Sequence, residues 1–275
     1  MNRARLILKY TLGVLLAIPL SPLLYFQGVR VKKTMPKLPE ATGNEGIAGT
    51  PEPSLRLLVL GESTMAGVGV DTHENGFAGH LARYLAAQCA TGVAWNVVAK
   101  SGYSAKKARE KLVPLIAGEP ADLIVVGLGA NDAFELNRPW VWGRDASALI
   151  TAIRAKAGNA PIVFLSMPPI KEFPAFPELV RFFIGNLSVM LAQTLMQEVK
   201  KHDRVYYVDG GLSPADWEKR YTGQYQRADF FSDGVHPSGL TYRIWAETTG
   251  GFIIENEEIM NYVKFLKIRS RSSLS

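Results

Sequence analysis

A serine, a histidine and an aspartate occur in two short segments where they could together activate a nucleophile. Ser63 lies in GEST (61–64), and Asp233 and His236 lie in DGVHP (233–237). A serine hydroxyl attacks a carbonyl at neutral pH only when a base accepts its proton. Imidazole suits this task because its ordinary pKa is close to 6.5. A carboxylate can hold the second ring nitrogen and stabilise the imidazolium, so acyl chemistry at Ser63 is the first hypothesis.

His236 is the base that the sequence favours among its four histidines. The other three, His73, His80 and His202, lie in a Gly-rich loop, a predicted helix and the charged run KKHD. Only His236 has a carboxylate three residues away in a constrained turn. The alternative for Asp233 is that it caps the helix expected to follow, and capping is compatible with orienting the imidazole.

The elements that must position these residues alternate regularly along the chain. Short apolar runs, which predict strands, lie at 55–60, 94–99, 123–127, 161–166 and 205–208. Helices are expected near 76–90, 104–117, 145–157, 178–201 and 238–249. This alternation predicts an α/β domain over 55–251, a three-layer α/β/α arrangement around about five parallel strands. Ligands of such sheets bind beyond the carboxyl ends of the strands.

Polar turns follow the first three predicted strands: GEST (61–64), KSGY (100–103) and GAND (129–132). Each is common when taken alone. In this order, and together with DGVHP, they resemble the four blocks of the SGNH hydrolases, or GDSL esterases, which centre on Ser, Gly, Asn and His. The resemblance covers roughly residues 55–250. The first block departs from the usual Gly-Asp-Ser-Leu, because Glu62 and Thr64 flank the serine.

The resemblance implies a flavodoxin-like fold and assigns roles to individual residues. Ser63, Asp233 and His236 would form the triad, and the backbone N–H groups of Ser63 and Gly102 would form an oxyanion hole with the side-chain amide of Asn131. Taken singly, Gly102 reads as a turn glycine and Asn131 as a self-bonded turn residue. Asp132 is expected to hold its loop rather than to touch substrate. No residue cluster calls for a metal, and no cofactor is implied.

The aromatic loop at 167–177 bears on the substrate. Prolines exclude a regular helix there, and Phe173 and Phe176 are expected to line an acyl-chain pocket. Phe182 and Phe183 are expected to pack the next helix onto the sheet. We therefore expect a small-molecule or lipid ester as substrate, either an acyl ester or a lysophospholipid-like one. The alternative substrates are O-acetyl groups of cell-envelope glycans. Acyl transfer to an acceptor other than water is also open. A non-catalytic, membrane-tethered scaffold is the alternative function outside the enzymes.

The N-terminal region predicts a membrane anchor over 1–30. Residues 10–26 contain no charged residue, and Arg3, Arg5 and Lys9 precede them, so a cleaved signal peptide is the competing interpretation. Residues 31–54, rich in Pro, Gly and charge, predict a flexible linker. Residues 252–275 are expected to form a basic C-terminal extension. The flanking charges do not fix the orientation of the anchor; the family resemblance implies an extracytoplasmic body.

The charge distribution limits the classes of partner. The 275 residues carry a net charge of +6, but residues 1–40 carry +6 and residues 264–275 carry +4, so the body between them carries −4. An acidic body with basic ends argues against a nucleic-acid groove and fits contact with an anionic membrane. The single cysteine, Cys89, cannot form an internal disulfide. The oligomeric state is left open.

Overall fold

A computed structural model describes residues 3–116, 120–210 and 213–263, and its centre is a six-stranded sheet. The strand order is β1-β3-β2-β4-β5-β6. The strands are β1 (Glu45–Ala48), β2 (Pro53–Gly61), β3 (Gly92–Ala99), β4 (Leu123–Gly127), β5 (Ile162–Phe164) and β6 (Val205–Tyr207). The five predicted parallel strands are confirmed, since β3, β2, β4, β5 and β6 pair in parallel. The sheet is mixed because β1 adds an antiparallel edge next to β3.

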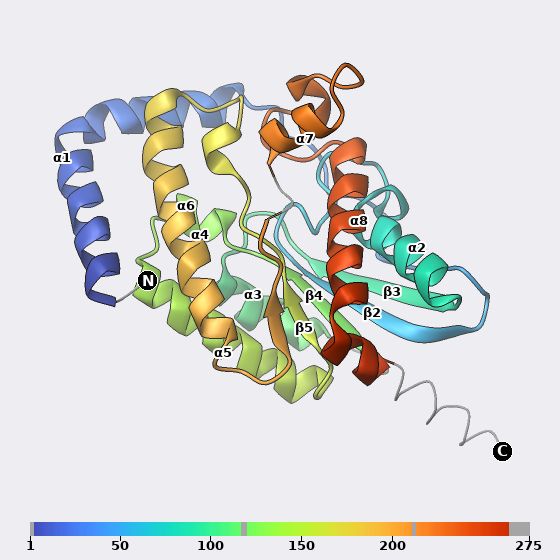
Figure 1. Cartoon of the computed structure of the whole chain (residues 1–275). Helices are drawn as coiled ribbons and strands as arrows, with labels where there is room; N and C mark the ends of the chain where they lie inside the picture. The colour runs from blue at the N-terminus through green and yellow to red at the C-terminus, as the bar shows by residue number, and fades with distance from the viewer. Residues whose placement is uncertain (1–2, 117–119, 211–212, 264–275) are drawn as a thin grey trace.

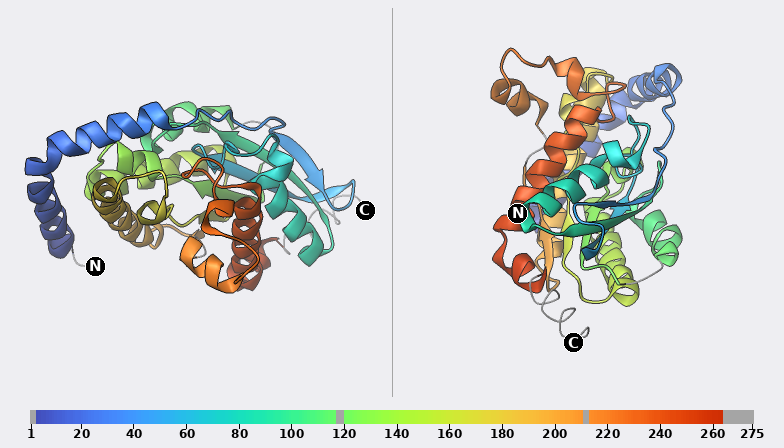
Figure 2. Two further views of the ribbon diagram at one scale, coloured as in Figure 1. Left: turned by 90° about the horizontal axis from the view of Figure 1, so that it is seen from above. Right: turned by 90° about the vertical axis from the view of Figure 1, so that its right-hand side faces the viewer.

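Alternating side chains of β2 face two separate cores, which makes the domain three-layered. Leu57 and Val59 belong to a core shared with α2 (Phe77–Cys89) and α8 (Gly239–Glu255). Leu58 and Leu60 belong to the opposite core, shared with α3 (Ala105–Lys111), α5 (Pro139–Ala157) and α6 (Glu178–Val199). Because successive residues of a strand point to opposite faces, one strand supports both helical layers. Figures 1 and 2 show the helices on the two faces of the sheet.

Shorter elements lie between these helices and strands. They are η1 (His73–Asn75), η2 (Val113–Leu115), α4 (Ala130–Phe134), η3 (Ile170–Glu172), α7 (Pro214–Arg220) and η4 (Arg227–Phe230). Helix α4 occupies a position where the sequence predicted a turn.

The segment 31–54, predicted as a flexible linker, is instead largely built into the domain. It contains the end of α1 (Arg3–Thr34) and the whole of β1. Between them, Ala41 N–H donates to the carbonyl of Ala66 at 2.9 Å, and Thr42 N–H donates to the carbonyl of Asp71 at 3.0 Å. These backbone bonds order a segment that lacks apolar periodicity, because its partners come from the loop after β2.

Helix α1 is long and apolar, as the sequence predicted, and it contacts the domain along α6. The ring of Tyr10 also meets that of Trp140 edge to face, with centroids 5.2 Å apart. Figures 1 and 2 show α1 bending around the body, and Pro19 and Pro22 supply a local cause for the bend. At the other end of the chain, residues 257–263 are helical, and the basic cluster at 264–275 lies outside the described residues.

Candidate active site

The three polar turns meet because their strands are in register. Gly61 of β2 pairs with Ala99 of β3 on one side and with Gly127 of β4 on the other. Ser63, Gly102 and Asn131 follow these paired residues by two, three and four positions, so all three lie at the carboxyl edge of the sheet. The close packing at this edge requires glycine: a Cβ on Gly61 would lie 2.2 Å from the carbonyl oxygen of Gly127.

The backbone around Ser63 and Gly102 is suited to receive a ligand. Val68 N–H donates to the Ser63 carbonyl at 3.1 Å and closes the turn after β2. Gly102 has φ of +80° and open space where a Cβ would be, a backbone conformation that favours glycine. In the described part of the chain, neither the N–H of Ser63 nor that of Gly102 donates to another protein group.

Asp233 and His236 form a self-contained turn. One carboxylate oxygen of Asp233 accepts the backbone N–H groups of Val235 at 2.9 Å and His236 at 2.8 Å. The other lies 2.7 Å from the imidazole Nδ1 of His236. Helix α8 is capped instead by Ser238, whose hydroxyl accepts from Thr241 N–H. The capping alternative for Asp233 is therefore wrong, because its oxygens are bound within its own turn.

The environment of Asp233 favours its ionised form. Burial by itself raises the pKa of the carboxyl, but the hydrogen bonds and positive charge of His236 outweigh burial and hold the pKa below its ordinary value. The other three histidines lie in different surroundings. Burial is the main cause that lowers the pKa of the His73 and His80 imidazoles, to about 4 for His80. The imidazole Nε2 of His202 bonds to the Ser147 hydroxyl at 2.9 Å. Of the four histidines, only His236 lines the cavity that Ser63 also lines.

One cavity of about 910 Å³ brings together most of the residues that the sequence singled out. Its lining includes Ser63, Gly102, Asn131 and His236, with Asp233 behind the imidazole.

The predicted pocket aromatics lie in the wall of the same cavity. Phe173 and Phe176 are buried there, with ring centroids 5.7 Å apart. Phe182 contradicts the expectation that it packs α6 onto the sheet. Its side chain is 54% exposed and faces a groove beside α1.

Glu62 is a site residue whose role sequence reasoning missed. Its carboxylate is 1% exposed and accepts the backbone N–H groups of Ala130 at 2.8 Å and Asn131 at 2.9 Å, together with the side-chain amide of Asn131. Burial is the largest influence on this carboxyl and raises its pKa to about 7. An acid directly after a buried strand was the available signal, because such a group needs hydrogen-bond donors nearby.

Two further carboxylates hold the loops of the site. Asp132 is fully buried and accepts from Ala105 N–H and the Asn137 amide, both at 2.9 Å, which agrees with its expected loop-holding role. Burial raises its pKa to about 6. Glu40 was missed: it accepts from Ser101 N–H at 2.8 Å and pairs with Lys100 at 2.9 Å. Its partners lie about sixty residues away, so no local pattern indicated this role.

Among the residues that the structure describes, no group of three or more His, Cys, Asp or Glu side chains is placed to bind an ion.

A three-layer α/β/α domain with a serine, an imidazole–carboxylate pair and a side-chain amide beside one cavity is an arrangement typical of serine hydrolases. The GDSL-like Lipase/Acylhydrolase family model matches residues 59–244. The chain belongs to this family.

Individual proteins resemble the chain in sequence or in fold. A GDSL-like esterase, Rv1075c of Mycobacterium tuberculosis, is 26% identical over 195 residues, which span 70% of this chain and 60% of that protein. Among solved structures, a lipolytic G-D-S-L family protein of Veillonella parvula has a TM-score of 0.54 and 15% identity, covering 74% of this chain and all of that one. A lipase/acylhydrolase of Enterococcus faecalis has a TM-score of 0.52 and 19% identity, with 72% and 95% covered. These structures share the fold.

Proposed function

We propose that this protein hydrolyses acyl esters through an acyl-enzyme on Ser63, with His236 as base and Asp233 as its partner. The observation that carries the proposal is the single cavity lined by Ser63, Gly102, Asn131 and His236. Asp233 holds the Nδ1 side of the imidazole, which leaves Nε2 as the nitrogen to receive the serine proton.

The reaction follows from these positions. The Ser63 oxygen attacks the ester carbonyl as its proton passes to His236, and the carbonyl oxygen becomes an oxyanion. His236 then returns the proton to the departing alcohol, which leaves an acyl-serine. Water, deprotonated by His236, attacks the acyl-serine, and collapse of the second tetrahedral adduct releases the acid and restores the serine.

The oxyanion would be met by the N–H groups of Ser63 and Gly102 and by the Asn131 amide. One amide hydrogen of Asn131 is held by Glu62, and the nitrogen lies 3.3 Å from the carbonyl of Tyr103. A contact that long is weak, so it can be exchanged for a stronger bond to a developing negative charge. Glu62 thus fixes the amide while leaving one donor for the reaction.

The cavity wall favours an apolar acyl group. The buried rings of Phe173 and Phe176 continue into Phe134 and Phe231, with centroids 5.5–5.8 Å apart. All four line the cavity. Removing an acyl chain from water against such a surface is favourable by about 25 cal/mol per Å².

Substitution of the proposed nucleophile and base tests the mechanism. We expect Ser63→Ala and His236→Ala each to lower kcat by around 10⁶, because the residues of a triad act as a unit. A fluorophosphonate should label the parent protein at Ser63 and fail to label Ser63→Ala. Ser101→Ala is the matched control, since Ser101 also lines the cavity, and it should still be labelled. Labelling or full turnover without Ser63 would reassign the nucleophile, and an unlabelled parent would favour the scaffold alternative.

A series of model esters tests the acyl preference. Rates of hydrolysis should rise from acetyl to chains of about eight carbons, as burial of each added CH₂ contributes roughly 0.8 kcal/mol. Hydrolysis of acetylated sugars without hydrolysis of the longer esters would instead support O-acetylesterase activity.

A further inference from the structure

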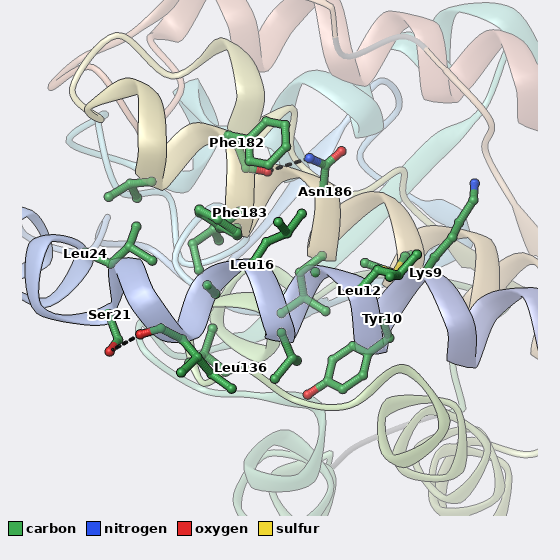
Figure 3. Close-up of a pocket in the computed structure, with 18 of the residues that line it drawn as sticks. Lys9, Tyr10, Leu12, Leu16, Ser21, Leu24, Leu136, Phe182, Phe183 and Asn186 are labelled. Atoms are coloured by element: carbon green, nitrogen blue, oxygen red, sulfur yellow. Dashed lines mark hydrogen bonds between the residues drawn. The ribbon is translucent and has the colours of Figure 1, made fainter.

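An apolar groove of about 1060 Å³ runs between α1 and α6, outside the cavity that contains Ser63. Figure 3 shows side chains of both helices lining it, among them Leu12 and Leu16 from α1 and Phe182 and Phe183 from α6. Leu136, from the segment after α4, adds to the same groove.

The groove belongs to a larger apolar face that is exposed in this structure. Leu16 is 59% exposed, Leu136 60% and Phe182 54%. Both α1 and α6 are long and apolar enough to cross a membrane; 6% of the most apolar 18-residue stretch of α1 is buried in the protein, against 39% of that of α6. Exposed apolar surface of this extent marks an interaction site.

The charges around this face favour a lipid surface as its partner. Helix α1 carries no acidic residue, and basic residues flank its apolar stretch on both sides: Arg3, Arg5 and Lys9 before it, and Arg30, Lys32 and Lys33 after it. Basic groups beside an apolar helix attract anionic lipid headgroups. The face therefore fits an anionic bilayer.

The groove lies next to the cavity of the proposed active site, and the two share part of their walls. Gly28, Phe134 and Val180 line both. Val31 of α1 also lines the cavity, and so does Met35, the residue directly after α1. An acyl chain lying in the groove is therefore bounded by residues that also bound the cavity.

We infer that the substrate is an acyl ester of an anionic bilayer lipid, and that its acyl chain enters sideways from the membrane along the groove between α1 and α6. The inference rests on the proposed function and names its substrate class. The end of the acyl chain occupies the groove, and the ester carbonyl reaches Ser63. Lys32 and Lys37, which also line the cavity, then face the anionic headgroup.

The test compares two chain lengths in the full-length protein. p-Nitrophenyl butanoate and p-nitrophenyl hexadecanoate are presented in phosphatidylcholine vesicles with and without phosphatidylglycerol. Phe182→Glu or Leu136→Glu should lower the hexadecanoate-to-butanoate ratio of kcat/KM by about tenfold or more, because a charge is placed where the long chain lies. Leu115→Glu is the matched control, an exposed leucine of η2 outside the groove, and should keep the parent ratio. Phosphatidylglycerol should raise the hexadecanoate rate of the parent.

A second measurement does not depend on substituting the groove. A hexadecanoyl ester with a diazirine at its chain end, photolysed in phosphatidylglycerol vesicles with Ser63→Ala, should cross-link to α1 and α6. Cross-links elsewhere, or an unchanged ratio in both groove variants with normal circular dichroism, would overturn the inference. If butanoate is hydrolysed equally fast by Ser63→Ala, the proposed function is wrong. If hydrolysis needs Ser63 but the groove variants keep the parent ratio and the cross-links lie outside α1 and α6, only the entry route is wrong.

Discussion

Glu62 is the residue at which this chain departs most informatively from the Gly-Asp-Ser-Leu pattern that it resembles. Its three partners are neutral N–H groups of Ala130 and Asn131. No cation of the described residues is among the groups that oppose the rise in pKa caused by burial. The result is a carboxyl with a pKa near 7 directly before Ser63. The same bonds fix the loop that carries Asn131, which makes Glu62 a positioning residue of the proposed oxyanion hole.

Burial of Glu62 predicts how stability depends on pH. The pKa is about 4.5 in the unfolded chain and about 7 in the folded one, so the folded state binds more protons between these values. The free energy of unfolding should therefore fall as pH rises through this interval. Glu62→Gln should remove roughly 3 kcal/mol of that fall, as each pKa unit is about 1.36 kcal/mol.

Urea unfolding between pH 4 and about 8 measures this slope. Asp132 contributes with the same sign, but between pH 3.8 and about 6, so Asp132→Asn should act at lower pH and serves as the comparison. A Glu62→Gln protein whose stability falls with pH as steeply as that of the parent would contradict the burial argument.

Asn131 can be tested separately from the triad. Asn131→Ala should lower kcat by roughly 10²–10³, the cost of one oxyanion donor, with little change in KM. Asn159→Ala is the control for loss of a side-chain amide, because Asn159 is exposed and does not line the cavity. This variant should leave kcat and KM unchanged. A loss that appears wholly in KM would assign Asn131 to substrate binding instead.

At the scale of elements, the segment between α1 and β1 has a part in the site. Its Glu40 holds the turn that carries Gly102 through Ser101 N–H and Lys100. The ion pair is partly exposed and contributes little by itself, whereas the bond to the backbone orients the turn. The segment thus connects the apolar helix to the carboxyl edge of the sheet.

Loss of the Glu40 carboxylate should slow catalysis without unfolding the protein. We expect Glu40→Ala to lower kcat about tenfold, the equivalent of roughly 1.4 kcal/mol in the barrier, because the Gly102 N–H is less well aimed. Glu40→Gln should restore part of the rate, since its carbonyl oxygen still accepts from Ser101. Glu52→Ala, an exposed acid before β2, is the control. Equal kcat in the Ala and parent proteins would remove Glu40 from the site.

The elements show which features the sequence could predict. The parallel strands were predictable because each buried strand is a continuous apolar run between turns. Strand β1 was not, since EGIA is short and forms an edge. Helix α4 was missed because five residues beginning Ala-Asn-Asp resemble a turn. Asp233 and His236 were predictable together because their contact is local, whereas Glu40 and Ser101 meet only through the fold.

At the scale of the whole molecule, the chain combines an acidic catalytic body with a basic, apolar N-terminal helix. Composition predicted the helix but not where it lies. Its contact with α6 and the ring contact of Tyr10 with Trp140 are long-range, and an apolar segment looks the same whether it crosses a bilayer or lies against its own domain. Only the assembled structure shows that the predicted anchor and the proposed active site share a wall.

That shared wall affects how the protein should be prepared. Deleting the first 38 residues is an obvious way to obtain a more easily purified enzyme, yet it would strip Val31 and Met35 from the cavity and leave the outer surface of α6 bare. Such a shortened protein would retain Ser63, Asp233 and His236, and we expect it still to cleave small reporter esters. Its chain-length profile would then describe the truncation rather than the natural enzyme, so specificity should be measured on the full-length chain in lipid.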